Sequence, residues 1–68
     1  MQPIELEAQI ACVEREIRRR HAYYPRLVKA QQVSAEQARR EIAQMNAVLA
    51  TLRGLRFKEH QSLPNRKR

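Results

Sequence analysis

The chain has 68 residues, of which 43% are hydrophobic and 31% are charged, and its formal net charge is +7. A chain of this length holds one small domain at most, and below about 70–80 residues a single core rarely supplies enough stability on its own. No stretch comes near the roughly 18 consecutive apolar residues of a membrane-spanning helix, and the N-terminus has acids where a secretory signal has a basic start. We therefore expect a cytoplasmic protein with no membrane partner.

The first long pattern predicts a helix over about residues 3–31. Pro3 is tolerated at a helix start, because its missing N–H would have no acceptor there. Large apolar residues then recur in steps of four and three, which is the 3.5-residue period of a coiled-coil stripe. We expect this stripe to form half of a hairpin or dimer core, and its members are Leu6, Ile10, Val13, Ile17, Tyr24 and Leu27.

Pro25 interrupts this pattern, because proline removes a backbone donor and crowds the carbonyl four residues earlier. The segment from Arg26 to Gln32 contains good helix formers and no glycine. We therefore predict a kink near Pro25 and a helix that continues to about residue 31, rather than one that stops at Tyr23. Arg20 occupies a core-type position, where its guanidinium either reaches outward past its neighbours or pairs with a carboxylate across an interface.

A second helix is predicted over about residues 35–56. The Ser34 hydroxyl can accept a hydrogen bond from the backbone N–H of Gln37, whose side chain can reach back to complete a capping box. Gly54 weakens the helix near its end, so we expect the helix to finish between Leu52 and Lys58. The second apolar stripe again advances in steps of four and three, and its members are Ala38, Ile42, Met45, Leu49 and Leu52.

Together the two patterns predict an all-α fold. We expect a kinked two-helix hairpin over residues 1–58, followed by a basic flexible tail over residues 59–68. Two helices enclose no interior, so apolar surface stays exposed unless another molecule covers it. A homodimer with a four-helix arrangement is the simplest cover. A monomeric hairpin that buries its stripe only on binding a partner is the alternative.

The chain offers little catalytic or metal-binding chemistry. Gly54 is the only glycine, which excludes a Gly-rich phosphate loop, and Cys12 is the only cysteine, which excludes an internal disulfide and a multi-cysteine zinc site. We expect Cys12 to be a partly buried structural thiol rather than a nucleophile. His21 and His60 lie on segments with no evident common site. The sequence thus predicts a protein that is not an enzyme and uses no metal or cofactor.

An aromatic and basic cluster gives the clearest candidate binding surface. Tyrosine and arginine dominate the energetics of protein interfaces. Tyr23 lies one step off the apolar stripe, so we expect it to be exposed among arginines. The predicted partner-binding patch consists of Arg19, Arg20, Tyr23 and Arg26. An ordinary solvated helix face is the alternative interpretation.

Nucleic-acid binding is a second hypothesis. Residues 27–42 superficially resemble a helix-turn-helix, and the basic tail that ends in Arg66-Lys67-Arg68 would attract phosphates. Two acids count against it, because Glu36 and Glu41 of the second helix would lie near the phosphates and repel them. The spacing of the apolar residues also fits a helical bundle better. Protein binding is therefore our first hypothesis.

Several strings of the sequence resemble a family of small phage and prophage proteins. They lie within residues 9–52 and read Glu14-Arg15-Glu16-Ile17-Arg18-Arg19-Arg20, Tyr24-Pro25-Arg26-Leu27-Val28, Ser34-Ala35-Glu36-Gln37-Ala38 and Glu41-Ile42-Ala43-Gln44-Met45. This family is similar to the phage quorum-sensing anti-activators. The resemblance implies a dimeric helical hairpin in the bacterial host cytoplasm that binds and inhibits host proteins, such as a quorum-sensing transcription activator and a pilus-assembly ATPase. A structural or assembly subunit of a phage particle is a further alternative.

Overall fold

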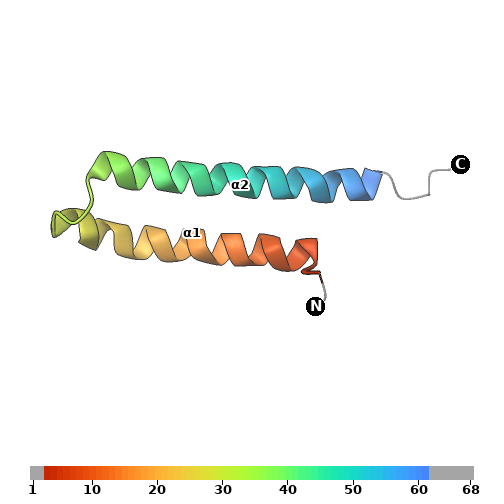
Figure 1. Cartoon of the computed structure of the whole chain (residues 1–68), viewed down its shortest axis with the longest axis horizontal. Coiled ribbons are helices and arrows are strands. Elements are labelled where there is room, and N and C mark those ends of the chain that lie inside the picture. The colour runs from red at the N-terminus through yellow and green to blue at the C-terminus, as the bar shows by residue number, and fades with distance from the viewer. Residues whose placement is uncertain (1–2, 62–68) are drawn as a thin grey trace, which may run out of the picture.

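Two long helices, joined by a short turn, make up the described part of the chain. The computed structural model describes residues 3–61 and contains α1, which spans Leu6–Lys29, and α2, which spans Ala35–Gln61. The helices run antiparallel, so the end of α1 and the start of α2 lie at the same end of the hairpin (Figure 1). Residues 3–61 contain no strand, and the all-helical, two-helix fold is confirmed. Within that range, neither helix combines the length and the apolar character that a membrane crossing requires.

α1 begins at Leu6, later than the predicted start near residue 3. Glu5 is the N-cap and keeps an extended backbone, with φ −67° and ψ 151°. Its carbonyl accepts the first intrahelical hydrogen bond, from the N–H of Gln9 at 3.0 Å. The Gln9 side-chain amide also donates to the carbonyl of Ile4 at 2.9 Å. These bonds mark the start of the helix after Glu5, and Pro3 lies outside it.

α1 ends at Lys29, earlier than the predicted end near residue 31. The N–H of Gln32 donates to the carbonyl of Leu27 at 2.9 Å, and the N–H of Gln31 donates to the carbonyl of Val28 at 3.0 Å. These two bonds form a Schellman motif, which satisfies the last carbonyls of a helix. The motif requires a left-handed residue, and Gln31 supplies it with φ 62°. The left-handed turn therefore stops the helix although no glycine is present.

α2 begins at Ala35, directly after a side-chain cap. The Ser34 Oγ accepts a hydrogen bond from the backbone N–H of Gln37 at 2.9 Å. The Ser34 carbonyl accepts from the N–H of Ala38 at 3.0 Å. The first N–H groups of a helix have no acceptor within it, and this hydroxyl satisfies one of them.

α2 continues through Gly54 to Gln61, beyond the predicted end near residue 56. A glycine inside a helix costs only about 1 kcal/mol relative to alanine, and the residues that follow it are good helix formers. Arg56 also donates to Glu7 of α1 at 3.2 Å, so this part of α2 still contacts the first turns of α1. The beginning of the predicted tail is therefore helical. The remainder of that tail, residues 62–68, lies outside the described residues.

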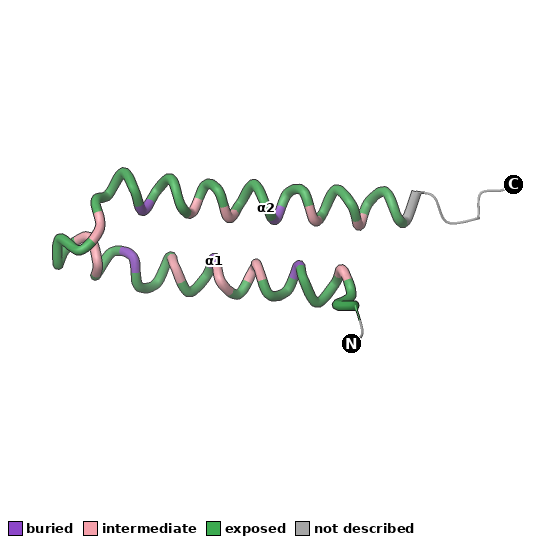
Figure 2. The backbone as a smooth tube through the Cα atoms, viewed as in Figure 1, coloured by how far each residue is buried: buried purple, intermediate pink, exposed green. Residues whose placement is uncertain are grey.

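The core is a single stripe between the two helices (Figure 2). Ile10 is only 2% exposed, and it forms a cluster with Ile17 and Leu49. Tyr24 and Ala38 are also buried. The other members of the two predicted stripes are half-buried, namely Leu6, Val13, Leu27, Ile42, Met45 and Leu52. The 3.5-residue period thus identifies the surfaces along which the helices meet.

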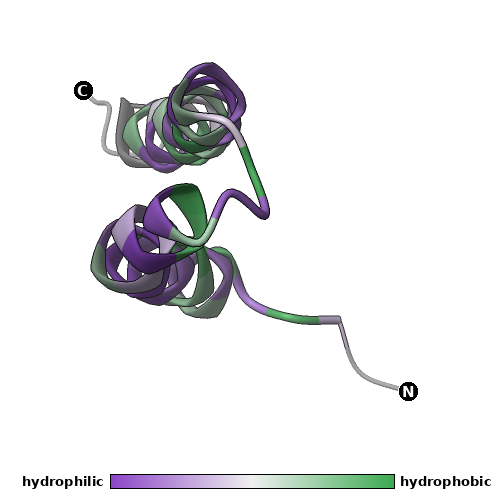
Figure 3. Ribbon diagram, turned by 90° about the vertical axis from the view of Figure 1, so that its left-hand side faces the viewer, coloured by the Kyte–Doolittle hydropathy of each residue, from purple (hydrophilic) through white to green (hydrophobic). Residues whose placement is uncertain are grey.

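The hairpin leaves several large apolar side chains uncovered. Viewed from the turn end, the two helices lie side by side, and no third element of the described chain covers them (Figure 3). Val48 is 47% exposed and Leu55 is 48% exposed, while Ile4 and Phe57 are more exposed still. Val48 and Leu55 are about two turns apart, so they share one edge of α2.

Candidate functional site

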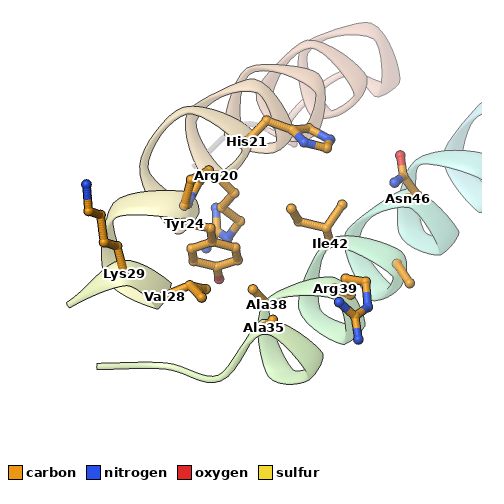
Figure 4. Close-up of a pocket in the computed structure, with 12 residues that line it drawn as sticks. Arg20, His21, Tyr24, Val28, Lys29, Ala35, Ala38, Arg39, Ile42 and Asn46 are labelled. Carbon is orange, nitrogen blue, oxygen red and sulfur yellow. The ribbon is translucent and has the colours of Figure 1, made fainter. Parts of the chain in front are cut away.

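A groove of about 690 Å³ lies between α1 and α2 near the turn. In Figure 4, the side chains of Tyr24, Val28 and Ile42 point toward the space between the helices. Ligand-binding sites in proteins are commonly concave and apolar, with volumes of roughly 300–1,000 Å³. The floor is apolar and comes from both helices, with Pro25, Val28, Ala35, Ala38, Ile42 and Ala43.

The sequence creates the groove by placing small residues near the turn. Pro25 lies within α1 and has a short, rigid side chain. Opposite it, α2 presents Ala35, Ala38 and Ala43, which fill little of the space between the helices. Farther from the turn the facing positions hold larger residues, such as Leu49, and these pack into the core. The hairpin is therefore closed in its middle and hollowed near the turn.

The rim of the groove is basic. Arg20, His21 and Lys29 line it from α1, and Arg39 lines it from α2. No aspartate or glutamate of the described residues lines it. Lys29 and Arg39 are exposed and make no ion pair within residues 3–61. The groove thus combines an apolar floor with two positive charges, those of Lys29 and Arg39, that no acid of the described chain pairs with.

Arg20 is ion-paired within its own helix. Its guanidinium donates a hydrogen bond to Oε1 of Glu16, and Arg19 donates to the other oxygen of the same carboxylate at 3.0 Å. The bond to Glu16 raises the pKa of the Arg20 guanidinium, and the bond from Arg20 lowers the pKa of the Glu16 carboxyl. The acceptor lies on α1, not across an interface, and Arg19 and Arg20 share it, so Arg20 is ion-paired although the three side chains together keep a net positive charge.

Tyr24 forms a polar contact beside the groove. Its hydroxyl donates a hydrogen bond to Oε1 of Glu41 in α2 at 2.9 Å. This bond raises the pKa of the Tyr24 hydroxyl, because ionisation would place a phenolate against a carboxylate. The ring of Tyr24 is buried and stacks on the ring of Tyr23, with centroids 5.2 Å apart and planes 24° apart. The contact ties the two helices together and orients the aromatic pair.

The predicted patch is divided by the structure. Arg20 lines the groove, whereas Arg19, Tyr23 and Arg26 are exposed on α1 and do not line it. Tyr23 is 38% exposed, and its contact with Tyr24 connects this exposed surface to the edge of the groove. The patch and the groove are therefore neighbouring surfaces.

Sequence reasoning missed Lys29, Arg39 and Ala43 as site residues. Arg39 and Ala43 each follow a stripe residue by one position, so the helical period already places both at one edge of the stripe. That signal could have identified a basic and apolar edge of α2. The contribution of Lys29 depends on where α1 ends, and the end is determined by the left-handed turn at Gln31.

Cys12 is exposed, so the prediction of a partly buried thiol is wrong. Two residues correspond to about 200° around a helix. Cys12 is two positions after buried Ile10, so its side chain points away from the core. Within the described residues, no three side chains of His, Cys, Asp or Glu are grouped so that they could hold a metal ion.

No protein-family model, curated protein or solved structure matches this chain. The resemblance to the phage quorum-sensing anti-activators therefore stays a prediction that depends on the residue strings given above. What the structure contributes is the groove, its unpaired cations and the exposed aromatic side chain beside it.

Proposed function

We propose that this chain is a small non-enzymatic module that binds a host protein and covers one of its functional faces, thereby inhibiting or modulating it. The observation that carries the proposal is the groove with an apolar floor and a basic rim near the turn. Apolar concavities flanked by charge are typical of surfaces that receive a segment of another protein. The exposed Tyr23 and Arg19 beside the groove would enlarge the contact.

The module acts as a homodimer in this proposal, with two hairpins in a four-helix arrangement. The exposed edge formed by Val48 and Leu55 supports this, because a second copy would remove both side chains from water. Arg39 and Val48 are about two and a half turns apart, so they leave α2 in opposite directions. A dimer built on the Val48 and Leu55 edge therefore leaves the groove open for a partner.

Light scattering tests the dimer directly. Wild type should have the mass of two chains, and Leu55→Glu should have the mass of one, because a buried carboxylate without a partner is strongly unfavourable. Ala47→Glu is the matched control, since Ala47 is exposed on the same helix and faces away from buried Leu49. A monomeric wild type, or a dimer that persists in Leu55→Glu, would exclude this interface.

The resemblance to the phage anti-activators supports a partner in the bacterial host cytoplasm, such as a quorum-sensing transcription activator or a pilus-assembly ATPase. Calorimetry with each purified host protein tests this. Wild type should bind at a fixed stoichiometry, and the Tyr23→Ala, Arg19→Ala double variant should bind at least about tenfold more weakly. If wild type binds neither protein, both partners are excluded. If the double variant binds as well as wild type, the exposed surface is not an anchor.

Nucleic-acid binding is the second candidate. The observation in its favour is that Arg15, Arg18 and Arg26 of α1 make no ion pair within the described residues. A titration with duplex DNA at increasing salt separates the two functions. Phosphate contacts would give an affinity that falls steeply with salt, with a slope of about −0.9 per phosphate neutralised. Protein binding through the groove leaves little affinity for DNA at physiological salt.

A further inference from the structure

We infer that the groove receives one amphipathic helix of the partner protein, with an apolar stripe that is flanked by acidic side chains. The inference rests on the proposed function and specifies which chemical kind of segment the groove takes. It follows from the shape of the groove and from the charges that remain unpaired around it.

The shape fits a third helix. The groove has α1 and α2 as its walls, and its floor is made of small and aliphatic side chains. Along α2 it extends from Ala35 to Asn46, which is about 16 Å, or roughly three turns of a helix laid beside it. A groove with two walls covers one side of a guest, and an amphipathic helix presents one apolar side. Aliphatic side chains at positions i, i+3, i+4 and i+7 of the guest helix would fill the part of the groove that is lined by Ala38 and Ala43.

The charge fits acidic flanks. Lys29 on α1 and Arg39 on α2 stand on opposite walls, both exposed and without an ion pair in residues 3–61. The guanidinium of Arg20 is already bound to Glu16. A guest with carboxylates on both sides of its apolar stripe would therefore meet Lys29 and Arg39, and complementary charges raise the association rate and suppress wrong partners.

The same charges disfavour a second copy of this chain as the occupant. In a two-fold symmetric dimer the same surface of each subunit meets at the axis. A dimer built on the groove would bring two sets of the same cations, Lys29 and Arg39, toward each other with no acidic residue of the groove to neutralise them. An acidic helix of another protein has no such cost.

Fluorescence polarisation with two designed peptides tests the inference on the full chain. The first peptide is an amphipathic helix about four turns long with leucines along one stripe and glutamates on both flanks. The second replaces every glutamate by lysine. Wild type should bind the glutamate peptide at least about tenfold more tightly than the lysine peptide. Equal affinities for the two peptides would overturn the inference.

Three variants locate the binding. Arg39→Glu should weaken binding of the glutamate peptide about tenfold, and Ala43→Glu should weaken it at least as much by charging the floor. Arg15→Glu is the matched control, since Arg15 is exposed, has no ion pair in the described chain and does not line the groove. If Arg15→Glu and Arg39→Glu weaken binding equally, the peptide responds to net charge alone and the groove is not the site.

Two further measurements keep the outcomes distinct. Circular dichroism should show the same helix content in all variants, because Arg39 and Ala43 are exposed. Light scattering of Ala43→Glu should give the same mass as wild type, whereas conversion of a dimer to a monomer would show that a second copy fills the groove and would overturn the inference. If a host protein binds wild type and Arg39→Glu equally well, the inference fails while the proposed function stands. If wild type binds the glutamate peptide but no host protein, the proposed function fails while the inference about the groove stands.

Discussion

The hydroxyl of Tyr24 donates a hydrogen bond to Oε1 of Glu41 at 2.9 Å, and this bond joins α1 to α2 beside the groove. The bond raises the pKa of the hydroxyl, because the ionised form would lose the donor and face a carboxylate. A raised pKa in the folded chain means that the contribution of this bond to stability is complete below the unfolded pKa, about 10. The contribution is lost as the pH rises through the higher pKa of the folded state.

A spectrophotometric titration checks the shift. The chain has two tyrosines, so Tyr23→Phe leaves Tyr24 as the only source of phenolate absorbance. We expect the midpoint in folded Tyr23→Phe to lie above the midpoint of the same chain in urea. Adding Glu41→Gln should lower the folded midpoint, because the nearby carboxylate is then absent. Coincident folded and unfolded midpoints would show that the hydroxyl has no such partner in solution.

Gln31 occupies a left-handed conformation, with φ 62°, that glycine adopts at lower cost. For an L-residue this conformation costs roughly 1–2 kcal/mol, and part of the gain from glycine is lost to its greater freedom when unfolded. Gln31→Gly should therefore raise the free energy of unfolding by about 0.5–1 kcal/mol, measured by urea titration. Gln32→Gly is the matched control, because its backbone is not left-handed, and it should not stabilise the chain. Equal effects at the two positions would contradict the assignment of the turn.

The period of the apolar residues was sufficient to predict both helices and the surfaces along which they meet, because burial in a two-helix structure follows one stripe per helix. It was not sufficient to predict where α1 ends. That position depends on a left-handed residue, and Gln31 gives no compositional signal for one. The period of the apolar residues also could not predict that Lys29 and Arg39 line the same groove, because their proximity depends on the register of the helices after the turn. Local patterns identified the elements, and the turn determined the site.

The register is visible in two ion pairs between the helices. Arg53 donates to Oε2 of Glu14 at 2.8 Å, and Arg56 donates to Oε1 of Glu7 at 3.2 Å. Both pairs are partly exposed, so each should contribute little to stability. A double-mutant cycle with Glu14→Gln and Arg53→Gln should give a coupling free energy of about 0.2–1 kcal/mol that decreases with added salt.

A charge exchange provides the control for this pair. The double variant Glu14→Arg, Arg53→Glu should recover most of the stability that either single variant loses, because the exchanged charges attract at the same separation. The single variants each place like charges together and should be the least stable of the set. No recovery in the double variant would mean that the helices do not hold this register in solution.

Gly54 offers a test of helix propensity that is separate from packing. It lies inside α2, and a Cβ added there would meet no atom within 4 Å apart from its chain neighbours and the adjacent helix backbone. Gly54→Ala should therefore raise the free energy of unfolding by about 0.5–1 kcal/mol, since glycine loses more backbone entropy on folding than alanine does. Ala50→Gly, at an exposed position of the same helix, should lower the free energy of unfolding by a similar amount.

Because self-association makes stability depend on protein concentration, urea titrations at two concentrations distinguish an effect on the helix from an effect on a dimer contact. A gain that is the same at both concentrations reflects the helix itself, whereas a loss that grows with concentration would show that a second chain packs closely against Gly54.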